Sequence, residues 1–322
     1  MIALRTRIFC IAPLALFANG VAAQAYPAKP IRIIVGAGSG GGVDTISRLV
    51  GQQLDQAWRQ QVVVEDKPGA GGAVASELVA KSPADGHTLL TMSISYAVIP
   101  ASHKNLPYDP IRDFAPVAVL VNSPNILVVH PSLPAKSVKE LITFAKAHPG
   151  QLTYASSGNG GAANLVLEAF KLATGTDIVH IPYKGTAPGV IDTIAGRISL
   201  TACAIVSGLD YSKQGKLRAL ATVGARRASA APELPTVAEA GVPGYAVDVW
   251  YAMFAPAAVP AAVLAKLNGE IIKILNAPDM KTRLAAIGLE PAAEPLDKTN
   301  AYIKSEIAKW MKVVTAAKIT VE

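Results

Sequence analysis

The feature that most constrains the fold is a glycine-rich loop between a short apolar run and an amphipathic segment. Residues 31–35 read Ile-Arg-Ile-Ile-Val, a β-branched run typical of a buried strand. Residues 36–42 follow as Gly-Ala-Gly-Ser-Gly-Gly-Gly. The apolar residues that come next recur at helical spacing: Val43, Ile46, Leu49, Val50 and Leu54. Glycines let main-chain N–H groups approach a ligand, and a helix N-terminus favours an anion, so this stretch predicts an oxyanion-binding loop.

Short strands and helices alternate along much of the chain, and the opening pattern returns near residue 152. Leu152–Ala155 reads as a strand, residues 156–161 as a small-residue loop, and apolar residues at helical spacing follow. Such alternation favours a parallel sheet with crossover helices. A chain of 322 residues is long enough for two lobes of this kind. The sequence therefore predicts an α/β protein with two lobes, each a mostly parallel sheet flanked by helices.

The two lobes require the chain to cross between them. We expect crossings near residues 122–125 and 244–250, which gives a first lobe of residues 26–123 plus 248–322 and a second lobe of residues 124–247. A chain with two consecutive domains and no return is the alternative. Ligands of open α/β sheets bind beyond the carboxyl ends of strands, so a cleft between the lobes is expected.

The first 25 residues have the pattern of a secretory signal peptide. Arg5 and Arg7 precede the apolar stretch Ile8–Phe17, and small residues allow cleavage near Ala23 or Ala25. The apolar stretch is too short to span a bilayer. We therefore expect a soluble periplasmic protein with Cys203 as its one cysteine and no intrachain disulfide.

Charge and composition exclude several kinds of partner. Removing residues 1–25 takes away two arginines and no acids, so the formal charge falls from +7 to +5. This modest, scattered positive charge can attract an anion, but it lacks the clustering expected of a nucleic-acid surface. No His or Cys pair has the spacing of metal ligands, so neither nucleic acid nor metal is expected.

Two enzyme motifs are present in outline. Gly36, Gly38 and Gly41 fit the dinucleotide pattern G-x-G-x-x-G, with Glu65 placed as a ribose-binding acid, but an exported protein has no ready supply of nicotinamide cofactor. Ser39 lies in a near match to the nucleophile elbow, and none of the five histidines makes a persuasive base. We therefore expect no enzyme and no cofactor, with a dinucleotide-dependent oxidoreductase as a remote alternative.

The candidate ligand-binding residues lie in loops at strand ends, where binding residues concentrate. From the residues themselves the candidates are Ser39, Gly40, Gly41, Gly42, Asp44, Ser93, Ser95, Ser156, Ser157, Gly158, Asn159, Tyr183 and Lys184. Each also has a structural interpretation: Asp44 fits a helix N-cap, and Lys184 fits an ordinary solvent-exposed lysine.

Many ordered blocks resemble the receptors of tripartite tricarboxylate transporters, also called Bug proteins. Blocks that carry the resemblance include Tyr26–Val35, Gly40–Asp44, Lys67–Gly72, Tyr154–Gly160, Ile181–Gly185 and Leu234–Gly241. The resemblance implies a two-lobed periplasmic binding protein of type II, the Venus-flytrap fold. Such a protein closes on a small, usually carboxylated solute and delivers it to a membrane permease. It also implies that the loops Gly40–Asp44 and Ser156–Asn164, including Asn164 itself, hold the carboxylate through main-chain N–H groups and water.

The sequence departs from the family pattern at two places. Ala37-Gly38-Ser39 replaces a proline-rich approach to the glycines. Near Ala204 the family often has Asp-Asn, which suits an amino group on the ligand, and this chain lacks that pair. The departure favours an apolar or aromatic carboxylate as the ligand over an amino acid. The resemblance thus predicts a monomeric solute receptor with a transient permease partner, and a sensory receptor that signals to a membrane kinase is the alternative.

Overall fold

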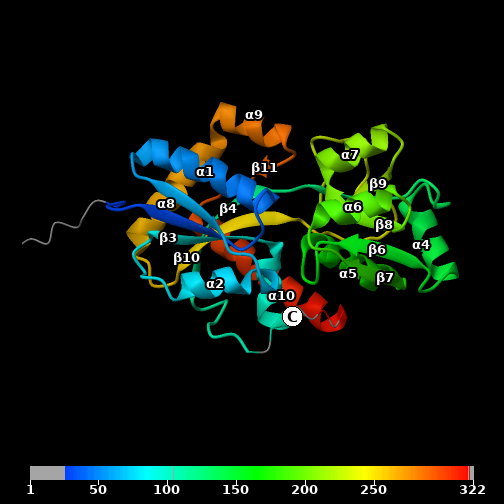
Figure 1. Cartoon of the computed structure of the whole chain (residues 1–322), viewed down its shortest axis with the longest axis horizontal. Coiled ribbons are helices and arrows are strands. Elements are labelled where there is room, and N and C mark those ends of the chain that lie inside the picture. Colours follow the sequence, from blue (N-terminus) through cyan, green and yellow to red (C-terminus); the bar gives the residue numbers. More distant parts are fainter. Residues whose placement is uncertain (1–25, 104, 318, 320–322) are drawn as a thin grey trace, which may run out of the picture.

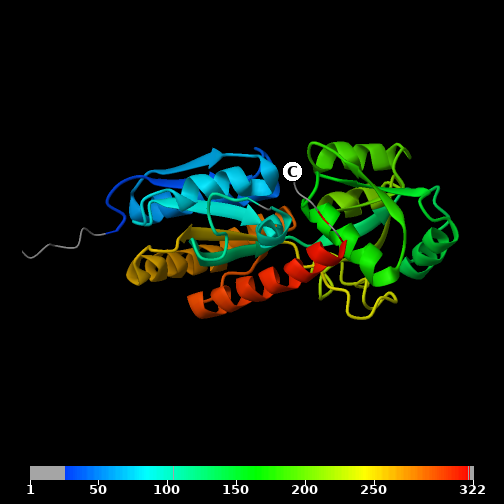
Figure 2. The same cartoon turned by 90° about the horizontal axis from the view of Figure 1, so that it is seen from below.

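The computed structural model describes residues 26–103, 105–317 and 319, which form two halves built on separate sheets (Figure 1). One sheet has six strands in the order β11-β4-β10-β3-β1-β2, and the other has five in the order β7-β6-β8-β5-β9. Helices flank both sheets, and the view from below shows the two halves side by side (Figure 2). The expected two-lobed α/β fold class is confirmed. Within the described ranges, no helix has the length and apolar character needed to cross a bilayer.

The six-stranded half takes the first part of the chain and its end. Its first elements are β1 (Ile31–Val35), α1 (Gly42–Trp58), β2 (Val62–Asp66), η1 (Ala70–Gly72), α2 (Ala73–Ala80), β3 (Thr88–Ser93), η2 (Ile94–Val98), α3 (Ile99–Ser102) and β4 (Phe114–Asn122). The returning elements are β10 (Trp250–Pro256), α8 (Ala261–Asn276), α9 (Pro278–Ala286), β11 (Glu290–Pro291) and α10 (Leu296–Ala317). Strand β1 pairs in parallel with β2 and β3, whereas β10 is antiparallel to β3 and β4.

The five-stranded half takes the middle of the chain. Its elements are β5 (Asn125–Val129), α4 (Val138–Ala147), β6 (Leu152–Ser156), α5 (Ala162–Thr174), β7 (Ile178–Pro182), α6 (Thr186–Ile194), β8 (Leu200–Ala204), α7 (Ile205–Lys213) and β9 (Arg218–Thr222). Strand β6 is parallel to β7 and β8, and β5 is antiparallel to β8 and β9. Parallel pairing is thus limited to three neighbouring strands in each sheet. Both sheets are mixed, because the first strand after each crossing between the halves, β5 or β10, runs antiparallel to both of its neighbours.

Burial explains why β1 and α1 form where the sequence predicted them. Ile31, Ile33 and Ile34 on β1 are fully buried, as expected of a strand covered on both faces. The helical stripe that includes Ile46 and Leu54 packs into the same apolar cluster as β1. The apolar pattern at this point therefore fixes both the strand and the helix on either side of the glycine loop.

The two crossings of the chain lie side by side at the junction between the halves. Ser123 N, in the first crossing, donates to Val249 O, in the second, at 2.7 Å. The chain returns through β10 to the first sheet, which is the return that the two-consecutive-domain alternative lacks. The proposed lobe boundaries at residues 123/124 and 247/248 stay a prediction.

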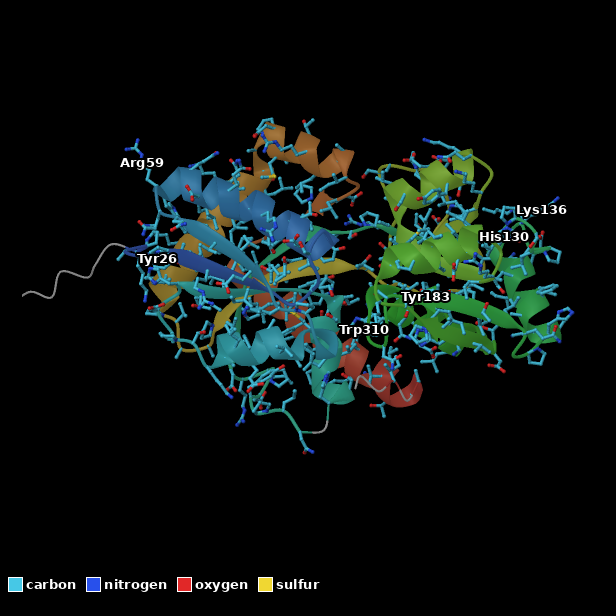
Figure 3. All side chains as sticks on the ribbon, in the orientation of Figure 1. Tyr26, Arg59, His130, Lys136, Tyr183 and Trp310 are labelled. Carbon is cyan, nitrogen blue, oxygen red and sulfur yellow. The ribbon has the colours of Figure 1, made fainter. Side chains whose placement is uncertain are left out.

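A buried carboxylate joins this junction to the last helix. Glu306 on α10 accepts the indole N–H of Trp250 at 2.9 Å and that of Trp310 at 3.2 Å, both on Oε2. Lys309 Nζ lies 3.0 Å from the other carboxylate oxygen, and the Glu306 side chain is almost fully enclosed. Helix α10 runs from the six-stranded half toward the five-stranded half (Figure 2), and Trp310 is labelled in Figure 3. The helix therefore ties the start of β10 to the region between the halves.

Residues 105–116, which follow α3, contain three prolines, a composition typical of a surface loop. Strand β4 begins at Phe114, so the segment ends in the sheet rather than in solvent. Phe114 contacts the rings of Tyr96 and Tyr108, each with ring centres 5.9 Å away, and Tyr96 Oη donates to Pro110 O. These aromatic contacts anchor a segment whose three prolines suggested exposure.

Candidate functional site

Two glycine loops with the same internal geometry form the candidate site. In loop 1 (residues 36–41), between β1 and α1, Gly40 has φ +78° and its amide donates to Asp44 Oδ2 at 2.8 Å. In loop 2 (residues 157–161), between β6 and α5, Gly160 has φ +71° and its amide donates to Asn164 Oδ1 at 3.0 Å. The positive φ explains the glycine at each position, since L side chains rarely adopt it.

The turn before each helix repeats as well. Gly41 N donates to Gly38 O at 3.4 Å, and Gly161 N donates to Gly158 O at 3.2 Å. Gly41 and Gly161 are the N-caps of α1 and α5, with φ/ψ values of −77°/168° and −70°/158°. The two halves thus present the same turn followed by the same helix start.

This geometry determines which amides remain for a ligand. In α1 the first N–H bonded within the helix belongs to Thr45, and in α5 it belongs to Leu165. The amides of the three residues before each of these precede the helical hydrogen-bond ladder, as in any helix. Those amides, together with the positive end of the helix dipole, suit a carboxylate.

Both loops lie at the carboxyl ends of their strands, and these ends of the two sheets face the junction between the halves. A Cβ built on Gly42 would lie 2.5 Å from Tyr251 Oη, and Tyr251 reaches Ser123 Oγ at 3.3 Å across the crossing. On the other side, Ile205 N donates to Pro124 O at 2.9 Å where β8 ends. Because β6 and β8 are parallel neighbours, loop 2 follows the same edge of its sheet as Ile205.

The predicted residues in loop 1 and in the first turn of α1 divide into exposed and buried ones. Ser39, Gly40 and Gly42 are exposed, and Gly41 is partly exposed. Asp44 is buried; besides the Gly40 amide, its Oδ1 lies 2.6 Å from Arg48 Nε, at an angle that does not make a hydrogen bond. The Asp44 side chain therefore caps the turn at the start of α1 by accepting the Gly40 amide, and its carboxylate lies beneath the loop.

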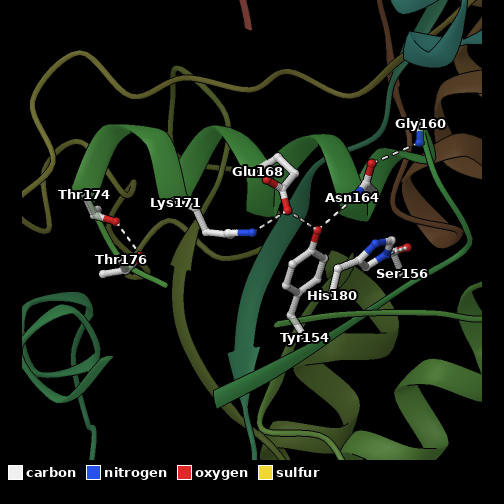
Figure 4. Close-up of polar contacts among 9 residues, drawn as sticks. All are labelled: Tyr154, Ser156, Gly160, Asn164, Glu168, Lys171, Thr174, Thr176 and His180. Carbon is white, nitrogen blue, oxygen red and sulfur yellow. Dashed lines mark hydrogen bonds and ion pairs between the residues drawn. The ribbon is translucent and has the colours of Figure 1, made fainter. Parts of the chain in front are cut away.

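The predicted residues of loop 2 surround a polar network that sequence reasoning missed (Figure 4). Ser156 is buried; its Oγ accepts the Gly158 amide at 3.0 Å, lies 3.1 Å from Gly158 O and lies 2.6 Å from His180 Nε2. The His180 ring stacks on Tyr154 with centres 4.7 Å apart. Ser156 thus shapes loop 2 from below, while Ser157 and Gly158 are partly exposed and Asn159 is exposed.

The network continues from Asn164 into helix α5. Asn164 Nδ2 donates to Tyr154 Oη at 2.8 Å, and Tyr154 Oη donates to Glu168 Oε1 at 2.6 Å. Lys171 Nζ reaches the same Glu168 oxygen at 2.8 Å. Burial and the neighbouring Glu168 raise the pKa of Tyr154, and burial lowers the pKa of His180. Tyr154 therefore keeps its hydroxyl proton, and its direction of donation is fixed.

Of the remaining predicted residues, the two serines and Tyr183 use their hydroxyls in bonds within the protein, whereas Lys184 and Ala204 are exposed. Ser93 and Ser95, after β3, place their hydroxyl oxygens 2.8 Å apart. Tyr183, labelled in Figure 3, donates its hydroxyl to Asp192 Oδ2 at 2.8 Å, and burial followed by this bond raises its pKa. Lys184 is exposed, and Ala204 is exposed as the N-cap of α7.

The two enzyme patterns find other roles in the structure. Glu65 pairs with Arg32, with Arg32 Nε 2.8 Å from Glu65 Oε1. The carboxylate that would bind a ribose is therefore already engaged. The Ser156–His180 pair has the spacing of a nucleophile and base, but the serine is only 2% exposed and a tyrosine ring covers the imidazole. Among the described residues, no group of three His, Cys, Asp or Glu side chains is arranged to hold a metal.

A cavity of about 210 Å³ lies at the junction but is separate from both loops. It is lined by residues from both halves, among them Asn122, Asn125, Arg226, Ser229, Asp248 and Glu290. Ser229 donates to Glu290 Oε1 at 2.9 Å through its hydroxyl, which links the five-stranded half to β11. The residues of this cavity include none of the predicted ligand-binding residues.

Comparison with known proteins identifies the kind of protein this chain is similar to. A family model described as "Tripartite tricarboxylate transporter family receptor" (TctC) matches residues 46–319. BugT from Bordetella pertussis (strain Tohama I) is 35% identical over 322 residues, covering 98% of this chain and 99% of BugT.

Solved structures agree with this similarity. An R. palustris protein solved with adipate superposes with a TM-score of 0.82 at 34% identity, covering 92% of this chain and 99% of that one. MatC from Rhodopseudomonas palustris, solved with bound malate, has a TM-score of 0.79 at 28% identity, covering 90% of this chain and all of that one.

Proposed function

Because the chain belongs to the tripartite tricarboxylate transporter receptor family, we propose that it captures a small carboxylated solute between its lobes and delivers it to a membrane permease. The family consists of solute-binding receptors rather than enzymes. Relatives solved with adipate and with malate support a small carboxylate as the ligand. The observation that carries the proposal is the pair of matched glycine loops, one in each half, at edges that face the junction.

Binding would rest on the helix-start amides of both loops. Ligand oxygens would accept hydrogen bonds from amides near Gly42 in loop 1 and near Ala162 in loop 2, directly or through water. Charge-assisted bonds of this kind strengthen when the lobes close and water leaves the cleft. The hinge for closure would be the two crossings at Ser123 and Val249, which are joined by one main-chain hydrogen bond.

The other parts of the proposal concern the whole protein. The lobes would comprise residues 26–123 plus 248–322 and residues 124–247. The protein would act as a periplasmic monomer, after cleavage of a signal peptide near Ala23 or Ala25; residues 1–25 lie outside the described residues. Permease contact would be transient, since the receptor must release both solute and partner.

A thermal-shift screen of residues 26–322 tests the proposal. Dicarboxylates, tricarboxylates, aromatic acids and amino acids are each added in large excess, and NADH is included for the oxidoreductase alternative. A ligand at a hundredfold excess over its Kd stabilises the native state by about 2.7 kcal/mol, which raises Tm measurably. We expect at least one small acid to raise Tm. A shift with NADH and none with any acid would overturn the proposal.

A further inference from the structure

We propose that the contact between Ser229 and Glu290 is a latch that holds the two halves open, so that these residues set ligand affinity from outside the cleft. Ser229 follows β9 in the five-stranded half, and Glu290 begins β11 in the six-stranded half. The inference rests on the proposed function, because it concerns the closure that accompanies solute binding.

The latch consists of two hydrogen bonds to one carboxylate oxygen. Glu290 Oε1 accepts the main-chain amide of Ser229 at 3.2 Å and its hydroxyl at 2.9 Å. One other side-chain hydrogen bond between described residues, from Ala225 N to Asp248 Oδ1 at the second crossing itself, joins residues 124–247 to the rest of the chain. The side-chain hydrogen bonding between the halves is therefore concentrated at Glu290.

The latch and the two glycine loops lie on opposite flanks of the strands that meet the crossings. In the six-stranded sheet, β4, β10 and β3 separate β11 from β1, which leads into loop 1. In the five-stranded sheet, β8 and β5 separate β9 from β6, which leads into loop 2. Strands β4 and β5 flank the first crossing, and β10 follows the second, between the halves that Figure 1 labels β11 and β9. The crossings therefore lie between the loops and the latch.

A hinge in this position works as a lever. Rotation about the crossings that brings the two loops together moves the opposite flank apart. The bonds from Ser229 to Glu290 must then lengthen or break, so they oppose closure. A ligand that binds the closed form has to supply the free energy of these bonds, and its apparent affinity is lowered by the same factor.

The surroundings of the latch allow it to open without disturbing the core. Ser229 is exposed and Glu290 is half-buried. Both line the cavity of about 210 Å³ at the junction, together with polar side chains such as Asn122 and Asn125. Water in this cavity can take the place of Ser229 at the carboxylate. A bond that exchanges with water contributes modestly, which suits a contact that tunes an equilibrium instead of locking it.

Removing the carboxylate tests the latch through its effect on affinity. The acids adipate, malate, citrate, benzoate and glutamate are titrated by calorimetry into wild-type protein, and those that bind are then titrated into E290A, S229A and S229A/E290A. We expect E290A to tighten binding about fivefold and the double variant to match it. S229A should tighten binding about twofold, because the amide of residue 229 still donates.

A matched carboxylate serves as the control. Glu294 is exposed and pairs with Lys298 inside the six-stranded half, so E294A removes the same charge without touching the other half. We expect E294A to change Kd by less than about twofold. A carboxylate with a merely structural role would weaken binding when removed, whereas a latch that opposes closure strengthens it.

A reversible crosslink tests the direction of the movement. In S229C/E290C the two thiols are bridged by a short bifunctional methanethiosulfonate, which a reducing agent removes, and the native Cys203 is buried. The bridge prevents the flank from separating. We expect bridged protein to bind the same acids at least about tenfold more weakly than the reduced form of the same variant.

The outcomes separate this inference from the proposed function. Unchanged or weaker binding by E290A, or equal binding by the bridged and reduced forms of S229C/E290C, would overturn the latch while leaving the receptor function intact. If wild-type protein binds none of the acids, the proposed function fails, and this inference with it.

Discussion

Gly160 donates its main-chain amide to Asn164 Oδ1 at 3.0 Å, and this bond fixes loop 2 before any ligand arrives. The equivalent bond in loop 1 joins Gly40 to Asp44. A loop held in this way need not be ordered on binding, so less conformational entropy is lost. The same bond removes one amide from each loop, and the ligand is left with the amides of the first helical turn.

Replacing Gly41 by leucine should abolish acid binding without unfolding the protein. Gly41 has φ −77°, which L residues adopt freely, and the one close neighbour of a Cβ there is Gly38 O at 3.3 Å, a tight contact that a shift of the loop by a few tenths of an ångström relieves. The leucine side chain would cover the amides that follow it. We expect Tm to stay within a few degrees of wild type and the acid-induced shift to disappear. Gly38→Ala, at a position with open space, is the control that should keep both; unimpaired acid binding by Gly41→Leu would refute the loop assignment.

Glu306→Ala should destabilise the protein strongly. The variant leaves the indole N–H groups of Trp250 and Trp310 buried without an acceptor and creates a cavity. We expect a loss of about 3 kcal/mol in the free energy of unfolding, measured by urea denaturation. Glu294→Ala removes an exposed carboxylate that pairs with Lys298, and it should cost less than about 0.5 kcal/mol. Equal losses in the two variants would contradict the structural role of Glu306.

His180 should make stability fall with acidity before the carboxylates titrate. Burial lowers the pKa of His180 below the ordinary value of 6.5. The charge of Glu168 partly opposes this shift, and the charge of Lys171 adds to it. The unfolded chain therefore takes up the proton first, so stability is full above pH 6.5 and declines as pH falls through the lowered pKa. His180→Gln should lose less stability than wild type between pH 7.5 and pH 5, measured by urea unfolding. His130, labelled in Figure 3, bonds through its ring to Ser132 instead of to the network, so His130→Gln should follow wild type.

Cys203 should react with thiol reagents only when the protein opens. Burial raises the pKa of its thiol to about 12, and the side chain is 1% exposed. Thiolate is the reactive form, so the native thiol is both inaccessible and protonated. We expect labelling by a chromogenic disulfide at pH 8 to be at least about a hundredfold slower in native than in urea-unfolded protein. Rapid labelling of the native chain would show that the end of β8 opens readily.

Local patterns in the sequence predicted the parts of the site that are local. Ile31–Val35 and the helix after Gly41 follow from apolar periodicity and glycine content. The two-lobed fold was predicted from the return of the same strand–loop–helix pattern near residue 152, and the family likeness implied it as well. The stacking of His180 on Tyr154 joins residues 26 positions apart, so no short-range pattern signals it. Ser156 was predicted from its exposed-looking loop, but its hydroxyl turns inward to Gly158 and His180. Sequence proximity identifies a loop, whereas the direction of each side chain depends on tertiary partners.

Trp250 and Trp310, which both donate to the Glu306 carboxylate, form an intrinsic fluorescent probe. Two of its three tryptophans meet at the point where β10 leaves the crossing, and the third, Trp58, lies at the far end of α1. Indole emission is sensitive to a nearby charge and to solvent, so motion about the crossing alters the ultraviolet fluorescence of this pair. The proposed lobe closure can thus be tested in unlabelled protein, with Trp58→Phe removing the background signal.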